Sequence, residues 1–150
     1  MNFEFACLTD PGRVRANNED CVATSDVHGL AVLADGMGGY NAGEIASAMA
    51  VSFIATEMGA WLMAGGRSPA SQDVRRALEV TVEQANESIY NAAVANVHFS
   101  GMGTTVVVGV FEQSRIVLAH VGDSRCYLLR DHRLTQLTRD HSLLQEQLDA

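Results

Sequence analysis

Cysteine is scarce in this sequence, and its scarcity excludes a disulfide framework. The chain has only three cysteines in 150 residues, Cys7, Cys21 and Cys126, and none of them shows C-x-x-C spacing. We therefore expect reduced thiols in a cytosolic or otherwise reducing compartment. Cys7 and Cys21 lie in strand-like runs, where packing in the core is the default role of a cysteine.

Long apolar runs are also absent. No continuous apolar stretch reaches the roughly 18 residues of a membrane span. The N-terminus alternates apolar and polar residues and has no basic, apolar signal pattern. No repeat, linker or low-complexity segment is visible. We expect a soluble, cytoplasmic protein without a membrane partner.

Positive charge is in short supply. The chain has 10 Lys and Arg against 18 Asp and Glu, which gives a formal net charge of −8. This balance argues against nonspecific binding to nucleic acid and to an anionic membrane surface. It is also unfavourable for binding an anionic phosphorylated substrate, unless bound divalent cations reverse the local sign of the charge.

The pattern of apolar residues predicts one folded domain over residues 1–150 that begins with strands and continues into two helices. With 47% hydrophobic and 19% charged residues, the chain can bury a core. Alternation predicts a half-buried strand at about 2–8, and a turn signal predicts a hairpin between strands at 21–25 and 30–34. Apolar residues spaced by three and four predict helices near 44–62 and 70–94.

After the helices the period switches back to strands. We expect strands at 105–111, 115–121, 126–129 and 133–137, joined by short turns, and the opening of a helix at 142–150 that is cut in mid-element. Strands, two helices and strands again indicate an α+β fold with antiparallel sheets.

The segment ADGMGG at 34–39 carries the strongest chemical signal. It ends an apolar strand in a carboxylate, Asp35, and three glycines follow within four positions. Glycine lets the backbone come close to a bound group. A carboxylate beside exposed backbone carbonyls suits a hard divalent cation such as Mg²⁺ or Mn²⁺. The alternative is a tight turn with an Asx-type hydrogen bond.

Two further polar loops repeat this combination of carboxylate and glycine at a strand end. The loop at 9–20 holds Arg13, Arg15, Glu19 and Asp20, and the loop after the strand at 115–121 holds Asp123. Three such loops suggest one shared site. The alternatives are a solvated acidic loop at 9–20 and an Asx turn at Asp123.

These motifs resemble those of the type-2C, metal-dependent protein serine/threonine phosphatases. The loop at 9–20, ADGMGG at 34, GMGTT at 101 and VGDSR at 121 occur in the order of that family and at roughly its spacing. The likeness is to the bacterial members that oppose Ser/Thr kinases. It covers essentially the whole chain, but only about the first three-fifths of the family's catalytic domain.

The resemblance implies a fold and a metal site. The fold is two stacked antiparallel β-sheets, a β-sandwich, with pairs of antiparallel helices on the outer faces, incomplete here at the C-terminus. Two ions, Mn²⁺ or Mg²⁺, would be bridged by Asp35, and the Gly36 carbonyl would contact one of them. Glu19 and Asp20 would act through metal-bound waters, and Asp123 would hold a third ion.

Other positions follow or depart from the family pattern. Arg15 matches the arginine that binds the substrate phosphate, and a guanidinium fork suits two phosphate oxygens. Arg13 falls outside that position and is expected at the surface. Asn18 is expected to tie its loop together through its amide. Met37 stands where many members have a histidine as candidate general acid, and methionine cannot transfer a proton.

Two aspartates of the family pattern, in Asp-Gly and Asp-Asn pairs, have no match after Asp123.

The first functional hypothesis is a phosphatase acting on phosphoserine and phosphothreonine, with phosphorylated proteins and a Ser/Thr kinase as partners. The isolated 150-residue chain is then expected to be weak or inactive. The second is a non-catalytic regulator that binds phosphoproteins. A third, an interaction scaffold, leaves the acidic, glycine-rich strand ends unexplained.

Overall fold

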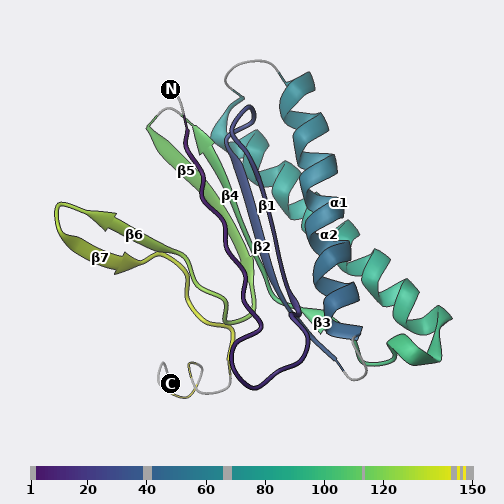
Figure 1. Ribbon diagram of the computed structural model, residues 1–150. Helices are drawn as coiled ribbons and strands as arrows, with labels where there is room; N and C mark the ends of the chain where they lie inside the picture. The colour runs from purple at the N-terminus through teal and green to yellow at the C-terminus, as the bar shows by residue number, and fades with distance from the viewer. Residues whose placement is uncertain are drawn as a thin grey trace.

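A five-stranded antiparallel sheet, covered on one face by two helices, forms the body of the computed structural model (Figure 1). The structure describes residues 3–38, 42–65, 69–112 and 114–142, together with 145 and 147. The strand order is β1-β2-β4-β5, and the short strand β3 continues the pairing along β2. The five strands are β1 (Asp20–Ser25), β2 (Leu30–Met37), β3 (Gly103–Thr104), β4 (Val106–Glu112) and β5 (Arg115–Val121).

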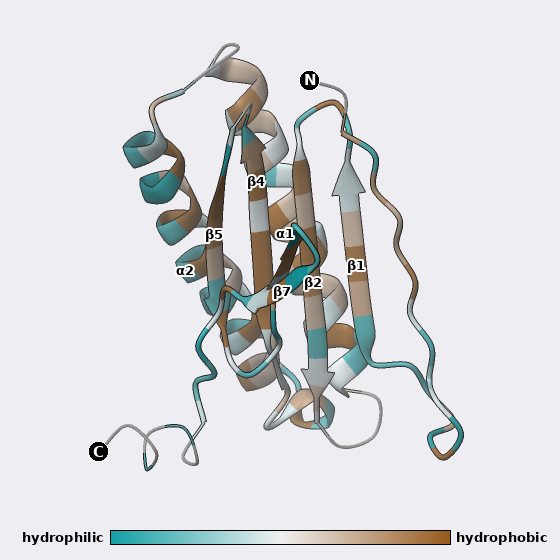
Figure 2. Cartoon of the chain, turned by 90° about the vertical axis from the view of Figure 1, so that its left-hand side faces the viewer, coloured by the Kyte–Doolittle hydropathy of each residue, from teal (hydrophilic) through white to brown (hydrophobic). Residues whose placement is uncertain are grey.

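The helices α1 (Ala42–Ala64) and α2 (Ser71–Ala95) run antiparallel to each other on one face of the sheet (Figure 1). A short 3-10 helix, η1 (Val97–Phe99), leads from α2 back to the sheet. The hairpin of β6 (Tyr127–Arg130) and β7 (Arg133–Gln136) projects on the face away from the helices, where Figure 2 shows β7 crossing in front of the sheet. The predicted α+β fold with antiparallel sheets is therefore confirmed.

The core lies between the sheet and the helices. Alternate residues of β2 point into it, and so do the residues of α1 and α2 that recur every three or four positions. Burying such side chains contributes about 1.5–3 kcal/mol each for the larger ones. The buried apolar residues are Leu30, Val32, Ala34, Ala42, Ala46, Ala50, Val51, Ile54, Met58, Val74, Leu78, Ala85, Ile89, Met102, Val106, Val108 and Val110.

Helix α1 is apolar around most of its circumference. By length and composition alone it could cross a membrane, although no continuous apolar run within it reaches 18 residues. Glu44 and Glu57 interrupt the apolar runs, yet the helix remains apolar on average. In the structure Ala46, Ala50 and Ile54 are fully buried, which accounts for the apolar composition through packing on the sheet.

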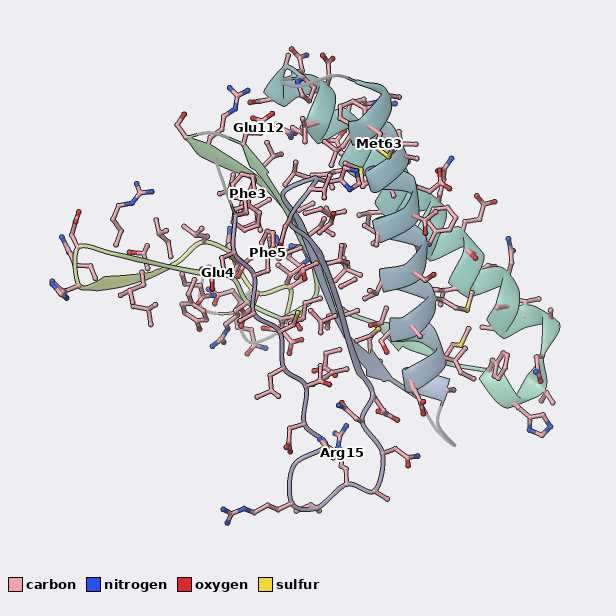
Figure 3. All side chains as sticks on the ribbon, turned by 45° about the horizontal axis from the view of Figure 1, so that its top comes forward. Phe3, Glu4, Phe5, Arg15, Met63 and Glu112 are labelled. Atoms are coloured by element: carbon pink, nitrogen blue, oxygen red, sulfur yellow. The ribbon has the colours of Figure 1, made fainter. Side chains whose placement is uncertain are left out.

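The predicted N-terminal strand at 2–8 is wrong for the described residues, because residues 3–10 form no strand. The alternation has another cause: Phe3 and Phe5 both pack on Phe111 of β4, with ring centroids 6.0 and 5.3 Å away. Figure 3 shows these two rings at the sheet, far from Arg15 in the loop that follows. Cys7 is exposed, so its predicted place in the core is wrong as well.

Several predicted boundaries move by one to three residues. Strand β2 runs to Met37 rather than ending at Ala34, so Asp35 lies within a strand rather than after one. Strand β4 begins at Val106 rather than Thr105, and β6 begins at Tyr127 rather than Cys126. The predicted helix opening at 142–150 falls mostly outside the described residues and stays a prediction.

Candidate metal centre

One end of the sheet, which we call the acidic end, collects the predicted site residues. It is the end where β1 begins at Asp20 and β2 runs through Asp35 to Met37. Antiparallel pairing places Asp20 directly opposite Asp35. The Gly36 N–H donates to the Glu19 carbonyl at 3.0 Å, which extends the pairing by one more bond. Both predicted acidic motifs are thus fixed to each other by the main chain.

The loop before β1 carries Arg15 to this end of the sheet. Its first turn is closed by the Gly12 N–H, which donates to the Asp10 carboxylate at 2.7 Å. The Asn18 amide oxygen accepts from the Asp20 N–H at 3.0 Å, which confirms the predicted tie. One nitrogen of Arg15 lies 3.5 Å from the Glu19 carboxylate, yet the Arg15 side chain remains 70% exposed. An exposed guanidinium of this kind can reach an incoming anion.

The third acidic residue, Asp123, lies in the turn after β5. Gly122 has a φ of +97°, a conformation that favours glycine. The neighbouring Ser124 hydroxyl shares a hydrogen bond of 2.7 Å with the Thr105 hydroxyl, and Thr105 in turn bonds to Asp35. The turn that bears Asp123 is therefore attached to the strand that bears Asp35.

These elements surround a cavity of about 620 Å³. Its lining includes five of the six predicted site residues, and the sixth, Asp20, is the cross-strand partner of Asp35. The structure therefore brings all six together. The cavity is lined by Arg15, Ala16, Asn17, Glu19, Asp35, Gly36, Met37, Gly38, Thr105 and Asp123.

Asp35 experiences an unfavourable environment for its negative charge. Partial burial raises the pKa of its carboxyl, and repulsion by Asp20, together with a hydrogen bond that the protonated Asp35 carboxyl donates to the Asp20 carboxylate, raises it further. Arg15 lowers the pKa of Asp35, whereas Asp123 raises it. The balance is a raised pKa, because the nearby carboxylates and the loss of solvent outweigh one exposed cation.

The donor atoms at this end fit a hard divalent cation in their chemistry. They are carboxylate and carbonyl oxygens, which Mg²⁺ and Mn²⁺ prefer. Within the described part of the chain, no three His, Cys, Asp or Glu side chains are gathered closely enough to hold an ion by themselves. Mg²⁺ usually keeps several waters and binds only one or two carboxylates, so the residues present suit such an ion without a dense cluster.

Two features of the site escaped the sequence analysis. A Cβ on Gly36 would lie 2.0 Å from the Gly43 carbonyl oxygen, so the start of α1 packs directly on the main chain of β2. The second is Thr105, whose part in the site was not predicted from the sequence. No pattern in the sequence pairs Gly36 with Gly43, whereas the polar run of Thr104 and Thr105 at the start of a buried strand was a visible signal.

Comparison with known proteins places the chain in a family. The family model described as protein phosphatase 2C matches residues 13–147. The serine/threonine phosphatase Stp of Listeria monocytogenes is 41% identical over 99% of this chain and 58% of its own length. The serine/threonine protein phosphatase PstP of Mycobacterium tuberculosis is 39% identical over 98% of this chain and 27% of its own length.

Solved structures give the same result. The crystal structure of M. tuberculosis PstP superimposes with a TM-score of 0.82 at 38% identity, over 95% of this chain and 56% of that one. The PstP catalytic domain in complex with two manganese ions gives a TM-score of 0.81 at 39% identity, over 95% of this chain and 57% of that one. The chain thus spans a little over half of the phosphatase domains that it matches. On its sequence and its fold, it belongs to the protein phosphatase 2C family.

Proposed function

We propose that the protein is a metal-dependent serine/threonine phosphatase that hydrolyses phosphoserine and phosphothreonine esters of cytoplasmic proteins. Residues 1–150 contribute the N-terminal part of its catalytic domain. The observation that carries the proposal is the acidic end of the sheet, where Asp35 and Asp123 line one cavity together with Arg15, and Asp20 lies opposite Asp35 on the neighbouring strand. The names of the relatives support the same reaction.

The metal ligands in this proposal are Asp35 and the Gly36 carbonyl for a pair of Mn²⁺ or Mg²⁺ ions. Glu19 and Asp20 act through water, and Asp123 serves a third ion. When bound, the ions supply positive charge for the phosphoryl oxygens and lower the pKa of water. The raised pKa of Asp35 supports this assignment, because a divalent cation would relieve the repulsion among the carboxylates.

Two residues of the cavity, Arg15 and Met37, bear on substrate binding and on proton transfer. The guanidinium of Arg15 can bind two phosphate oxygens at once, and its exposed position at the cavity leaves it accessible to a phosphorylated side chain. Met37 also lines the cavity and is 59% exposed. Because a thioether cannot donate a proton, Met37 has no part in protonating the leaving group.

Met37 is also the observation that favours the second candidate, a regulator that binds phosphoproteins without turnover. In both cases the partners are phosphorylated proteins, including those modified by a Ser/Thr kinase. Turnover distinguishes the two functions, because only the enzyme releases phosphate.

The test measures phosphate release from a phosphothreonine peptide by the protein at its natural length, with added Mn²⁺ and with a chelator. We expect Mn²⁺-dependent release that Asp35→Asn lowers at least about 100-fold in kcat/KM, since even outer-shell changes cost 10–100-fold. Asp26→Asn, in the turn at the opposite end of β1, is the matched control and should keep full activity. Tight peptide binding without phosphate release would instead show that the protein is a regulator.

A further inference from the structure

At Asp35, one of the hydrogen bonds that join β2 to the neighbouring strand is accepted by a side chain instead of the main chain. Leu33 faces Val107 of β4, and Gly36 faces Thr104 of β3. Two residues separate these pairs on each strand, so Asp35 faces Thr105. Facing residues of a hydrogen-bonded antiparallel pair exchange two main-chain bonds. Here the Thr105 N–H donates to the Asp35 carbonyl at 2.9 Å, but the Asp35 N–H donates to the Thr105 hydroxyl at 3.1 Å.

The same threonine also holds the turn that bears Asp123. Its hydroxyl lies 2.7 Å from the hydroxyl of Ser124. Its methyl group packs on Gly122, where an added Cβ would come within 2.8 Å of it. Thr105 is only 7% exposed, and both of its hydroxyl hydrogen bonds are half-buried. One side chain therefore touches the main chain of Asp35 and both neighbours of Asp123.

We propose that Thr105 is a positioning residue, whose hydroxyl fixes the separation of the Asp35 and Asp123 carboxylates and thereby sets how tightly the site binds divalent ions. The inference rests on the proposed function, because it assigns both carboxylates to metal ions. A hydroxyl can accept a hydrogen bond and donate one at the same time. It thus accepts from the Asp35 N–H and still bonds to Ser124.

Two variants distinguish the contribution of the Thr105 hydroxyl from that of its methyl group. Thr105→Val keeps the shape but leaves the Asp35 N–H without the acceptor of its half-buried hydrogen bond. Thr105→Ser keeps the hydroxyl and loses the methyl group. Ser124→Ala removes only the far end of the bridge, at a half-buried position outside the core. Thr81→Val is the control for loss of a buried threonine hydroxyl, since Thr81 bonds to Met58 between the helices.

The experiment titrates the protein at its natural length with Mn²⁺ and follows free Mn²⁺ by electron paramagnetic resonance. Outer-shell partners of metal ligands are typically worth 10–100-fold in affinity. We expect Thr105→Val to weaken Mn²⁺ binding at least about 10-fold and Ser124→Ala at least about threefold, on the same scale. Thr105→Ser should rescue binding to within about threefold of the wild type, and Thr81→Val should not change it.

Amide hydrogen exchange supplies a second readout that does not depend on metal. The Asp35 amide should exchange faster in Thr105→Val than in Thr105→Ser, whereas the amide of Val32 should not change. Unchanged Mn²⁺ affinity in Thr105→Val or in Ser124→Ala overturns the inference, and so does equal weakening by Thr105→Val and Thr105→Ser. If Thr105→Val does not fold, Ser124→Ala decides alone. A wild-type protein that binds no Mn²⁺ instead refutes the proposed metal centre, and the inference with it.

Discussion

At the acidic end of the sheet, Asp35 has Asp20 and Asp123 as neighbours, and the nearby cation Arg15 is already close to Glu19. At the opposite end, which we call the hairpin end, β1 turns into β2 and β4 turns into β5. There Glu112 forms an ion pair with Arg115, and aromatic rings pack against each other above the strands. The same sheet therefore ends once in compensated charge and once in carboxylates that repel one another.

The two ends of the sheet are stabilised in different ways. The hairpin end is held by contacts that the chain makes with itself, through Phe3, Phe5 and Phe111. At the acidic end the backbone is rigidly paired while the side chains carry excess negative charge. A rigid backbone with uncompensated carboxylates is suited to binding a cation, because the positions of the donor atoms are fixed before the ion arrives.

The largest effect is expected from a substitution that disrupts the close packing at the acidic end. In Gly36→Ala the new Cβ would lie 2.0 Å from the Gly43 carbonyl oxygen, so α1 must shift away from β2. We expect a loss of about 3 kcal/mol in the free energy of unfolding, measured by urea denaturation.

The control for this substitution is Gly12→Ala. Gly12 has a φ of +74° and no neighbour within 4 Å of an added Cβ, so only backbone strain of about 1–2 kcal/mol is expected. Equal losses for the two variants would show that the contact between β2 and α1 does not matter.

The second largest effect is expected from a substitution at the hairpin end, which should leave the acidic end unchanged. Phe111→Ala removes the ring on which Phe3 and Phe5 pack, and we expect a loss of about 2 kcal/mol in the free energy of unfolding for this half-buried phenylalanine. Mn²⁺ affinity should not change. Tyr90→Ala, at a side chain that is 66% exposed, should cost less than about 0.5 kcal/mol. A parallel fall in Mn²⁺ affinity would show that the two ends are coupled.

The smallest effect is the pH dependence that Asp35 confers in the absence of divalent ions. Its pKa is raised in the folded protein above the ordinary value of 3.8, so its contribution to stability is present below that pH and is lost as the pH rises through the folded pKa. Asp35→Asn should therefore be more stable than the wild type near pH 7, with a difference that shrinks toward about pH 4.

Urea midpoints across this pH range measure the effect of Asp35→Asn. Added Mn²⁺ should reverse the order of the two proteins, because it stabilises only the chain that binds it. A variant that is less stable than the wild type without Mn²⁺ would show that Asp35 is compensated within the fold.

Most of the fold was predictable because the periods of the apolar residues are strong. The strand at 115–121 matches β5 residue for residue, and the predicted helices differ from α1 and α2 by at most two residues at each end. The N-terminal alternation failed because period-two burial also arises when an extended segment lies on a sheet without pairing to it. The end of β2 was placed too early because Asp35 and Gly36 are poor strand formers, and tertiary pairing overrode that tendency.

The residue types at the strand ends follow directly from the sequence, and so do the excess of carboxylate over cation and the oxygen-donor chemistry of the site. The fold alone brings Asp20 opposite Asp35, places Gly36 against Gly43, and joins Asp35 to the turn of Asp123 through Thr105. Local patterns report whether a side chain prefers water or the core. Distances between residues far apart in the chain depend instead on strand register and helix packing, which are set by the whole fold at once.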